Sequence, residues 1–368
     1  MFDLDPAVTY LNHGSFGAVP RPIADVQSAL RLEMEREPVD FLVRRLPGAL
    51  DAARQRLAPF LGADPRDLVF VRNATAGVAA VLAHAPTDPG DEWLTTSHRY
   101  GAVGVAMATI AARRGATVKT VEIPFPPSDP EEVVALIRAA IGPRTRGVVV
   151  DAITSPTALR LPFEEIVRVA QAAGAWALVD GAHTPGHIDV DLDKTGADFW
   201  TGNLHKWLCA PRGCALLHVA RRWQHLIRPT IPSHDHETGF QASFDWVGTD
   251  DPTPWLAAPA ALDWHEAQGG AAFRARNLAL CAEGASIVAE ALGVADPRDR
   301  HPAFRLAMCT LPTPGFDANH LHAALRDRGI EVPCPPWSGA SWIRISAFSA
   351  YNRPENYEVL ARALRALA

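Results

Sequence analysis

Short apolar stretches rich in Val, Ile and Leu alternate with Ala-rich stretches along the first two thirds of the chain. Strands are predicted at residues 67–71, 93–96, 117–123, 147–153, 176–182, 197–201 and 213–219. Helices are predicted between several of them, as at residues 130–142 and 162–174, because apolar residues recur there at spacings of three and four. This alternation predicts a mostly parallel sheet covered by helices on both faces.

The pattern changes beyond about residue 255. Longer helices are predicted at residues 257–268 and 280–293, followed by a strand at 304–311 and a closing segment at 341–352 with a final helix. A chain of 368 residues exceeds what one hydrophobic core usually holds. We therefore expect a large α/β domain over residues 21–255 and a smaller C-terminal α+β domain over residues 256–368.

Composition narrows the range of partners. A hydrophobic fraction of 48% and a charged fraction of 21% are those of an ordinary globular protein. A net charge of -6 gives no reason to expect nucleic acid or an anionic membrane as a partner. The N-terminus lacks the charged and apolar regions of a signal peptide, which predicts a cytoplasmic protein. Five cysteines without a CxxC pair predict neither a disulfide framework nor a structural zinc site.

Two charged residues indicate a specific chemistry. Asp180 ends one predicted strand, and Lys206 follows the next. Ligands of such sheets bind at the carboxyl ends of strands, so both side chains can reach one pocket. A carboxylate can hold a protonated ring nitrogen, and a lysine can form an imine with an aldehyde, which together predict pyridoxal 5'-phosphate chemistry. Taken singly, Asp180 is also explained as a helix cap and Lys206 as a solvated surface charge.

The stretch VRNATAG at residues 71–77 follows a predicted strand and opens a helical pattern. Backbone N–H groups at the start of a helix, together with the Thr75 hydroxyl, suit a phosphate group. Thr75 as an ordinary N-cap explains the same pattern. The stretch therefore supports a phosphate site without establishing it.

The chain resembles the class V branch of the fold-type I pyridoxal-phosphate enzymes, and within it the isopenicillin N epimerase group. The resemblance covers nearly the whole chain and rests on motifs that occur in the family order: YLNHGSFGAVP, VRNATAG, SHRYGAV, ITSPTAL, DGAHTPG, TGNLHKW, VGTDDPTPW and WIRISAFSAYN. It implies a large domain with a mostly parallel seven-stranded sheet, and a small C-terminal domain. Residues 1–20 are expected to pack on the small domain and at the mouth of the active site.

The same resemblance implies which residues hold the cofactor. Lys206 is expected to bind it covalently, and Asp180 to pair with its pyridine nitrogen. His183 is expected near the phenolic oxygen of the ring. Further expected contacts are Ser155 at the same oxygen, Tyr100 or else His98 over the outer face of the ring, and Thr75, the Ala76 amide, Asn203 and His205 at the phosphate.

Substrate binding and assembly follow from the resemblance in the same way. Arg344 of WIRIS matches the arginine that grips the α-carboxylate of an amino-acid substrate, and its planar fork suits two parallel hydrogen bonds. The mouth of the pocket is assigned to Asn12, His13, Phe16 and Trp246. Thr249 of VGTDD is expected to reach the phosphate held by the other subunit, since active sites of this family lie at a homodimer interface.

The resemblance leaves the reaction open. Epimerisation at the α-carbon is the reaction of the group that the chain resembles, and it needs a second proton donor across the ring from Lys206, for which Tyr100 and His98 are candidates. C–S β-lysis, transamination and a catalytically silent homologue are the alternatives. Cysteine desulfurases carry a nucleophilic Cys in a loop before the carboxylate arginine. Cys334 lies in that region among prolines and outside that motif, so a persulfide-forming desulfurase is disfavoured.

Other combinations of residues carry less weight. Histidines at positions 234 and 236 and at positions 320 and 322 have no third ligand motif near them, so no metal site is predicted. No GxGxxG motif and no P-loop follows a predicted strand, which argues against nicotinamide and nucleoside-triphosphate chemistry.

Overall fold

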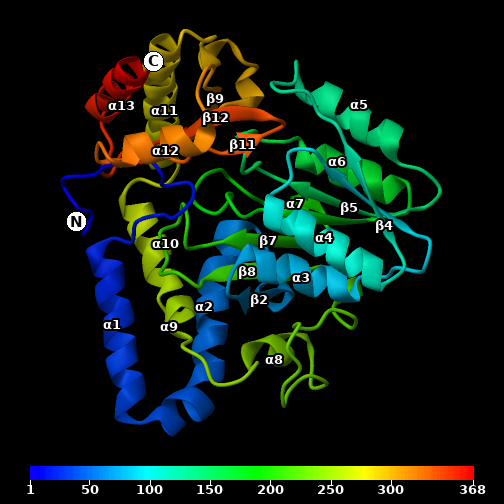
Figure 1. Ribbon diagram of the computed structural model, residues 1–368. Helices are drawn as coiled ribbons and strands as arrows, with labels where there is room; N and C mark the ends of the chain where they lie inside the picture. The colour runs from blue at the N-terminus through cyan, green and yellow to red at the C-terminus, as the bar shows by residue number, and fades with distance from the viewer.

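Seven strands form the central sheet of the computed structural model, which describes residues 1–368 (Figure 1). Their order across the sheet is β2-β8-β7-β6-β5-β3-β4. β8 runs antiparallel to both neighbours, β2 and β7, and the remaining adjacent pairs are parallel. The predicted seven-stranded, mostly parallel sheet is confirmed. Its strands are β2 Leu68–Val71, β3 Glu92–Thr96, β4 Thr117–Val121, β5 Thr145–Asp151, β6 Trp176–Asp180, β7 Phe199–Asn203 and β8 Ala215–Val219.

Both faces of this sheet are covered, which is why its central strands are apolar throughout. Successive side chains of a strand point to opposite faces. Val148 and Val150 of β5 join a core with α2, α5, α6 and α10, whereas Val149 joins a separate core with α3 and α4. The helices from α1 to α10 along the chain are α1 Arg21–Arg36, α2 Leu46–Leu61, α3 Ala74–His84, α4 Gly101–Arg113, α5 Pro130–Ala140, α6 Phe163–Ala172, α7 Leu192–Thr195, α8 Phe240–Asp245, α9 Thr253–Leu256 and α10 Ala258–Ala267.

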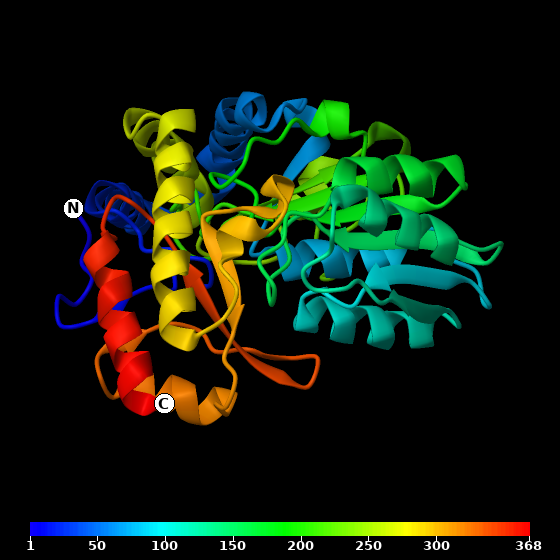
Figure 2. The same ribbon diagram turned by 90° about the horizontal axis from the view of Figure 1, so that it is seen from above.

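The C-terminal part of the chain forms a smaller α+β unit with its own core, seen to one side of the large sheet in Figure 2. An antiparallel sheet of order β11-β12-β9 packs with the long helix α11, which lies beside α13. Its elements are α11 Ala271–Leu292, β9 Met308–Pro312, α12 Ala318–Arg326, β10 Ile330–Glu331, β11 Pro336–Trp337, β12 Ala340–Ser346 and α13 Pro354–Leu367.

The N-terminal segment joins the two units. Its strand β1, Thr9–Tyr10, pairs in parallel with β10 of the smaller unit, and Leu11 is buried in that unit's core. Further along the segment, Gly17 lies against the backbone of Lys206, where a Cβ atom would overlap the carbonyl oxygen. The segment therefore runs from the smaller unit to the loop that carries Lys206.

Sequence patterns located the long elements better than their ends. All seven predicted strands of the large sheet are present, but α11 begins at Ala271 rather than at residue 280. The two-residue strands β1, β10 and β11 were not predicted, because two residues show no periodicity. The division of the chain at residue 255 stays a prediction. None of the helices combines the length and apolar character needed to span a bilayer.

The close approach at Gly17 leads to a stability prediction. Gly17→Ala should lower the free energy of unfolding by about 1–3 kcal/mol, because either the N-terminal segment or the Lys206 loop must move. Thermal unfolding of the purified protein measures the change. Gly48→Ala in α2 is the control, since a Cβ there meets nothing within 4 Å. Equal melting temperatures for the Gly17 variant and the wild type would show that the contact is not tight.

Candidate active site

A cavity of about 330 Å³ lies at the carboxyl ends of β5, β6 and β7, where the large sheet faces the smaller unit. Strand ends supply Asp151, Asp180 and Asn203, and the loop after β7 supplies Lys206. The start of α3, the start of α4, the N-terminal segment and β12 complete the lining with Asn73, Ala74, Thr75, Tyr100, Gly14, Ser15, Phe16 and Arg344, together with Ser155, Ala182, His183 and His205 from loops. The cavity brings together most residues that the sequence singled out.

Two buried carboxyl groups end neighbouring strands. Asp151 and Asp180 are register partners on β5 and β6, and both are almost fully buried. An oxygen of Asp180 accepts the Ala182 N–H at 3.0 Å, and an oxygen of Asp151 accepts the Tyr100 N–H at 3.3 Å. Burial raises the pKa of each carboxyl, and the negative charge of Asp180 raises the pKa of Asp151 further.

Lys206 projects into the cavity beside His183. Its Nζ lies 3.2 Å from His183 Nε2, and the other ring nitrogen of His183 accepts the indole N–H of Trp207 at 3.4 Å. Burial lowers the pKa of Lys206 to about 8, and the positive charge of Arg344 acts in the same direction. The pKa of His183 lies well below its usual value because the ring is buried and Lys206 and Arg344 are both cationic. The amine can therefore lose its proton near neutral pH.

One end of the cavity is built from the start of α3. Asn73 is the N-cap, since its side chain accepts the Ala76 N–H at 2.9 Å, so Thr75 is not the cap. The amide of Asn203 ties β7 to the same helix start by accepting the Ala74 N–H at 2.8 Å. Thr75 lines the cavity as predicted. Ala76 does not line it, and its N–H is already bound by Asn73.

His205 also lines this end. Its Nδ1 lies 2.7 Å from the carbonyl oxygen of Cys214, and burial lowers the pKa of the ring to about 4. A neutral imidazole, an amide, a hydroxyl and the positive end of a helix dipole are groups that suit a phosphate. These residues fit the phosphate of the expected cofactor.

Arg344 enters the cavity from β12 as a buried cation without an ion pair. Its side chain is 6% exposed and donates to the carbonyl oxygen and the hydroxyl of Ser155 and to the hydroxyl of Ser15. All three acceptors are neutral. Burial lowers the pKa of the guanidinium to about 10, which still leaves it charged at neutral pH. A buried charge with only neutral partners is costly, so an anionic ligand at this point would be strongly favoured.

Tyr100 lines the cavity with 43% of its surface exposed, whereas His98 does not line it. His98 is fully buried, and its two ring nitrogens lie 2.7 Å from the Thr157 hydroxyl and 2.9 Å from the Ile123 carbonyl oxygen. His98, the second choice for the residue over the cofactor ring, therefore lies in the core and not in the cavity. Of the two candidates, Tyr100 remains.

Three of the four residues expected at the mouth lie elsewhere. Phe16 lines the cavity and is exposed. Asn12 is buried and donates to Glu331, and His13 is buried with its ring stacked on Phe348 at 3.8 Å. Trp246 lines a different cavity, of about 560 Å³, next to α2. The motif of Asn12 and His13 also supplies cavity residues, but these two side chains pack into neighbouring structure.

Thr249 is exposed and does not line the cavity of its own chain. Its neighbour Asp250 forms an ion pair with Arg72, directly before the Asn73 cap. The loop thus lies near the start of α3 without entering the cavity. A role for Thr249 at a phosphate therefore requires a second subunit.

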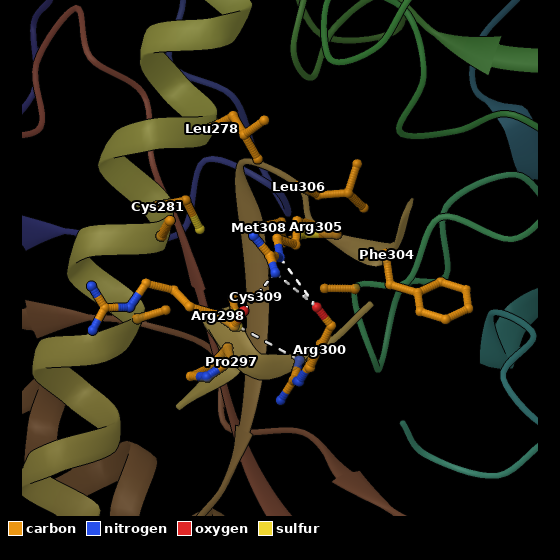
Figure 3. Close-up of a pocket in the computed structure, with 13 residues that line it drawn as sticks. Leu278, Cys281, Pro297, Arg298, Arg300, Phe304, Arg305, Leu306, Met308 and Cys309 are labelled. Atoms are coloured by element: carbon orange, nitrogen blue, oxygen red, sulfur yellow. Dashed lines mark hydrogen bonds between the residues drawn. The ribbon is translucent and has the colours of Figure 1, made fainter. Parts of the chain in front are cut away.

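A smaller cavity of about 30 Å³ lies between α11 and the segment 297–309 (Figure 3). Two of its arginines donate to backbone carbonyl groups, Arg300 to Thr310 at 2.7 Å and Arg305 to Arg298 at 2.6 Å, and Arg298 pairs with the carboxylate of Asp296 at 2.7 Å. Burial raises the pKa of the thiols of Cys281 and Cys309 in its wall. These groups hold the segment in place and show no feature of a second reactive site.

No cysteine lines the cavity of about 330 Å³ that contains Lys206. Cys334 is buried, and burial raises its pKa to about 12. A thiol of this kind is a poor nucleophile at neutral pH. The structure agrees with the sequence argument against Cys334 as a persulfide carrier.

Asp151 and Ser15 are lining residues that sequence reasoning missed. Asp151 ends an apolar strand in the same way as Asp180, so the same signal was available for it. Ser15 lies between residues that were singled out, and only its contact with Arg344 marks it as part of the site.

Comparison with known proteins gives the family. Residues 41–360 match the aminotransferase class-V family. The chain is 35% identical to the isopenicillin N epimerase of Streptomyces clavuligerus, with 99% of this chain and 96% of the relative covered. It is 29% identical to a probable chloroplastic L-cysteine desulfhydrase of Arabidopsis thaliana, with 99% and 83% covered. Since one relative is named as chloroplastic, a cytoplasmic location stays a prediction.

Solved structures show the same fold. A cystine C–S lyase, in complex with its product cysteine persulfide, superposes with a TM-score of 0.82 at 21% identity, covering 97% of each chain. The cysteine desulfurase CsdA of Escherichia coli superposes with a TM-score of 0.80 at 20% identity, covering 100% of this chain and 96% of that one. The match to the family and the near full-length relatives agree with the cavity, and the chain belongs to the aminotransferase class-V family of pyridoxal 5'-phosphate-dependent enzymes.

Proposed function

We propose that the chain changes the configuration of an amino-acid substrate at its α-carbon, as an epimerase or racemase similar to isopenicillin N epimerase. The observation that supports this most directly is Arg344, a buried cation without an anionic partner, in the same cavity as Lys206. Arg344 suits the α-carboxylate of the substrate, and Lys206 suits proton transfer at the adjacent carbon. Two near full-length relatives carry the name of this activity.

The lining residues fit the cofactor at both of its ends. We assign Lys206 to covalent attachment, Asp180 to the pyridine nitrogen, and His183 to the phenolic oxygen. When bound, pyridoxal 5'-phosphate supplies a conjugated ring that takes up the electron pair released at the substrate α-carbon. Asp180 keeps the ring nitrogen protonated, and the start of α3 binds the phosphate with Thr75, Asn203 and His205.

Inversion at carbon requires one proton carrier on each face of the reacting centre. Lys206, with its pKa lowered to about 8, is the first. Tyr100 is the second that we propose, because it lines the cavity from the start of α4 and the buried His98 cannot take this role. Ser155 and Ser15 hold Arg344 in place, so a substrate carboxylate bound to Arg344 would have a fixed position in the cavity.

C–S β-lysis is the second candidate. It requires proton removal by Lys206 and a side-chain pocket that admits sulfur, without a second carrier. Several relatives are named L-cysteine desulfhydrases, and a structural neighbour is a C–S lyase. The cavity opens beside the exposed Phe16, so it does not exclude a sulfur-containing side chain. Transamination remains a family-level alternative.

We also propose that the enzyme is a homodimer with shared active sites. The exposed Thr249 lies outside its own cavity, as expected of a residue that serves the partner. Exposed apolar side chains on α1 and on the segment between α1 and α2 offer surface for association: Val26, Leu32, Val39 and Val43.

The first functional prediction concerns the reaction. Wild-type enzyme, incubated in heavy water with a panel of amino acids and cysteine S-conjugates, should place deuterium at the α-carbon of one substrate and invert it. Lys206→Ala should lose at least about 10²–10⁴-fold in rate and lose borohydride labelling with the cofactor. Pyruvate together with sulfide or a thiol would instead identify a C–S lyase. A keto acid without either would identify transamination, and turnover of no substrate would contradict all three.

The second prediction concerns Asp151 in protein freed of its cofactor. Its pKa is raised by burial and by Asp180, so the folded chain keeps a proton that the unfolded chain releases. The stability from this group is complete below about pH 4 and declines as the pH rises toward the raised pKa. Asp151→Asn cannot ionise and keeps the acceptor for the Tyr100 N–H. The stability of the variant relative to the wild type should therefore increase as the pH rises.

Melting temperatures between pH 5 and pH 8 measure this effect, and the difference between the variant and the wild type should widen with each step in pH. The control is Asp25→Asn, at an exposed position of α1. It should follow the wild type at every pH. Parallel profiles for the Asp151 variant and the wild type would mean that Asp151 is ionised in the folded protein.

The third prediction concerns the shared site. A ligand that contacts both subunits binds the dimer more tightly than the monomer, so cofactor should oppose dissociation on dilution. Thr249→Ala should weaken this effect. Sedimentation of apo and holo forms across a dilution series measures it. Equal dissociation of both forms, with unchanged cofactor affinity in the variant, would leave Thr249 an ordinary loop residue.

A further inference from the structure

Trp207, the residue directly after Lys206, also contacts His183. Its indole is fully buried behind the cavity, and its N–H donates to His183 Nδ1 at 3.4 Å. The opposite ring nitrogen, His183 Nε2, lies 3.2 Å from Lys206 Nζ. Two consecutive residues thus bind the two nitrogens of one imidazole.

The direction of the first hydrogen bond is fixed by chemistry. An indole N–H can only donate, so His183 Nδ1 must be the acceptor and carries no proton. A neutral imidazole has one ring proton, which must then be on Nε2. His183 is 2% exposed, and this burial, together with the positive charge of Arg344, keeps the ring neutral.

We propose that Trp207 is a positioning residue that locks His183 in its Nε2–H tautomer, so that His183 enters the cofactor site as a hydrogen-bond donor and not as a proton-accepting base. The partner on the cavity side is then an acceptor: the unprotonated Lys206 amine, or an oxygen of the cofactor beside it. The tautomer of His183 follows from its hydrogen bonds alone. Only the consequence, that Lys206 and Tyr100 remain as the proton carriers, rests on the proposed function.

The indole cannot turn away from His183, because its surroundings hold it. His187 stacks on Trp207 with ring centroids 3.8 Å apart, and His187 is itself fixed by the Ala307 N–H at 3.1 Å. Gly186 has a positive φ, and a Cβ there would lie 2.7 Å from the Trp207 carbonyl carbon. Backbone and stacking together set the direction of the N–H group.

The chain offers a matched control for this proposal. Trp200 on β7 is also fully buried, but its indole nitrogen has no hydrogen-bond partner. Trp207→Phe and Trp200→Phe therefore remove a similar amount of buried ring and the same N–H group, and only the first removes a hydrogen bond. A difference between the two variants reports on the bond to His183 rather than on loss of packing.

The test uses the purified protein labelled with ¹⁵N-histidine, with and without cofactor, and His183→Gln to assign the signal. In the wild type, His183 should show a protonated Nε2 and a bare Nδ1, at neutral pH when cofactor is bound and above about pH 8 without it, where the Lys206 amine is unprotonated. In Trp207→Phe the ratio of the Nε2–H to the Nδ1–H form should fall by about three- to tenfold. Trp200→Phe should match the wild type.

A wild-type spectrum with the proton on Nδ1, or with both nitrogens protonated, overturns the proposal even if the Trp207 variant fails to fold. An unchanged tautomer ratio in a folded Trp207→Phe protein also overturns it. The spectra do not depend on turnover. They therefore test the tautomer of His183 even if the enzyme proves to be a lyase or shows no activity on the panel.

Discussion

The burial of Arg344 is the constraint on which the rest of the site depends. The guanidinium crosses from the smaller unit to Ser155 of the large one and to Ser15 of the N-terminal segment, and finds only neutral oxygen atoms there. A charge that has lost its water costs several kcal/mol unless it is paired. Three separate parts of the chain must therefore close around this side chain, and the cavity is the space that they leave. An anionic substrate group would complete the shell that folding leaves incomplete.

The remaining charges of the cavity follow from the same burial. Lys206 shares the space with Arg344, which helps lower its pKa to about 8, while Asp180 acts in the opposite direction. Asp151 and Asp180 meet at adjacent strand ends because the register of β5 and β6 aligns them. Lys206, Arg344, Asp151 and Asp180 share one low-dielectric cavity, so each shifts the pKa values of the others. Their protonation states are therefore linked and change together.

Sequence reasoning succeeded where chemistry requires a residue at a strand end and was less reliable for motif neighbours. Asp180 and Lys206 were found because a parallel sheet brings strand ends together, and the same logic applied to Asp151 would have found it. His98, His13 and Asn12 belong to motifs near the site, but their side chains turn into the core, which a linear pattern does not show. The smaller unit was recognised by its change of pattern, although β1, β10 and β11 are too short to show a period.

Because Lys206 and Trp207 are adjacent in the sequence, the positions of the lysine amine and of His183 are linked. Trp207 follows Lys206, so any shift of this loop moves the reactive amine and the donor of His183 together. The tight approach of Gly17 to the Lys206 carbonyl also holds this loop. Since the tautomer of His183 depends on Trp207, the loop sets both where the amine lies and which hydrogen bonds it can receive. A reaction that inverts a carbon centre depends on which faces carry proton donors. Its specificity would thus be decided partly by a buried ring that never contacts the substrate.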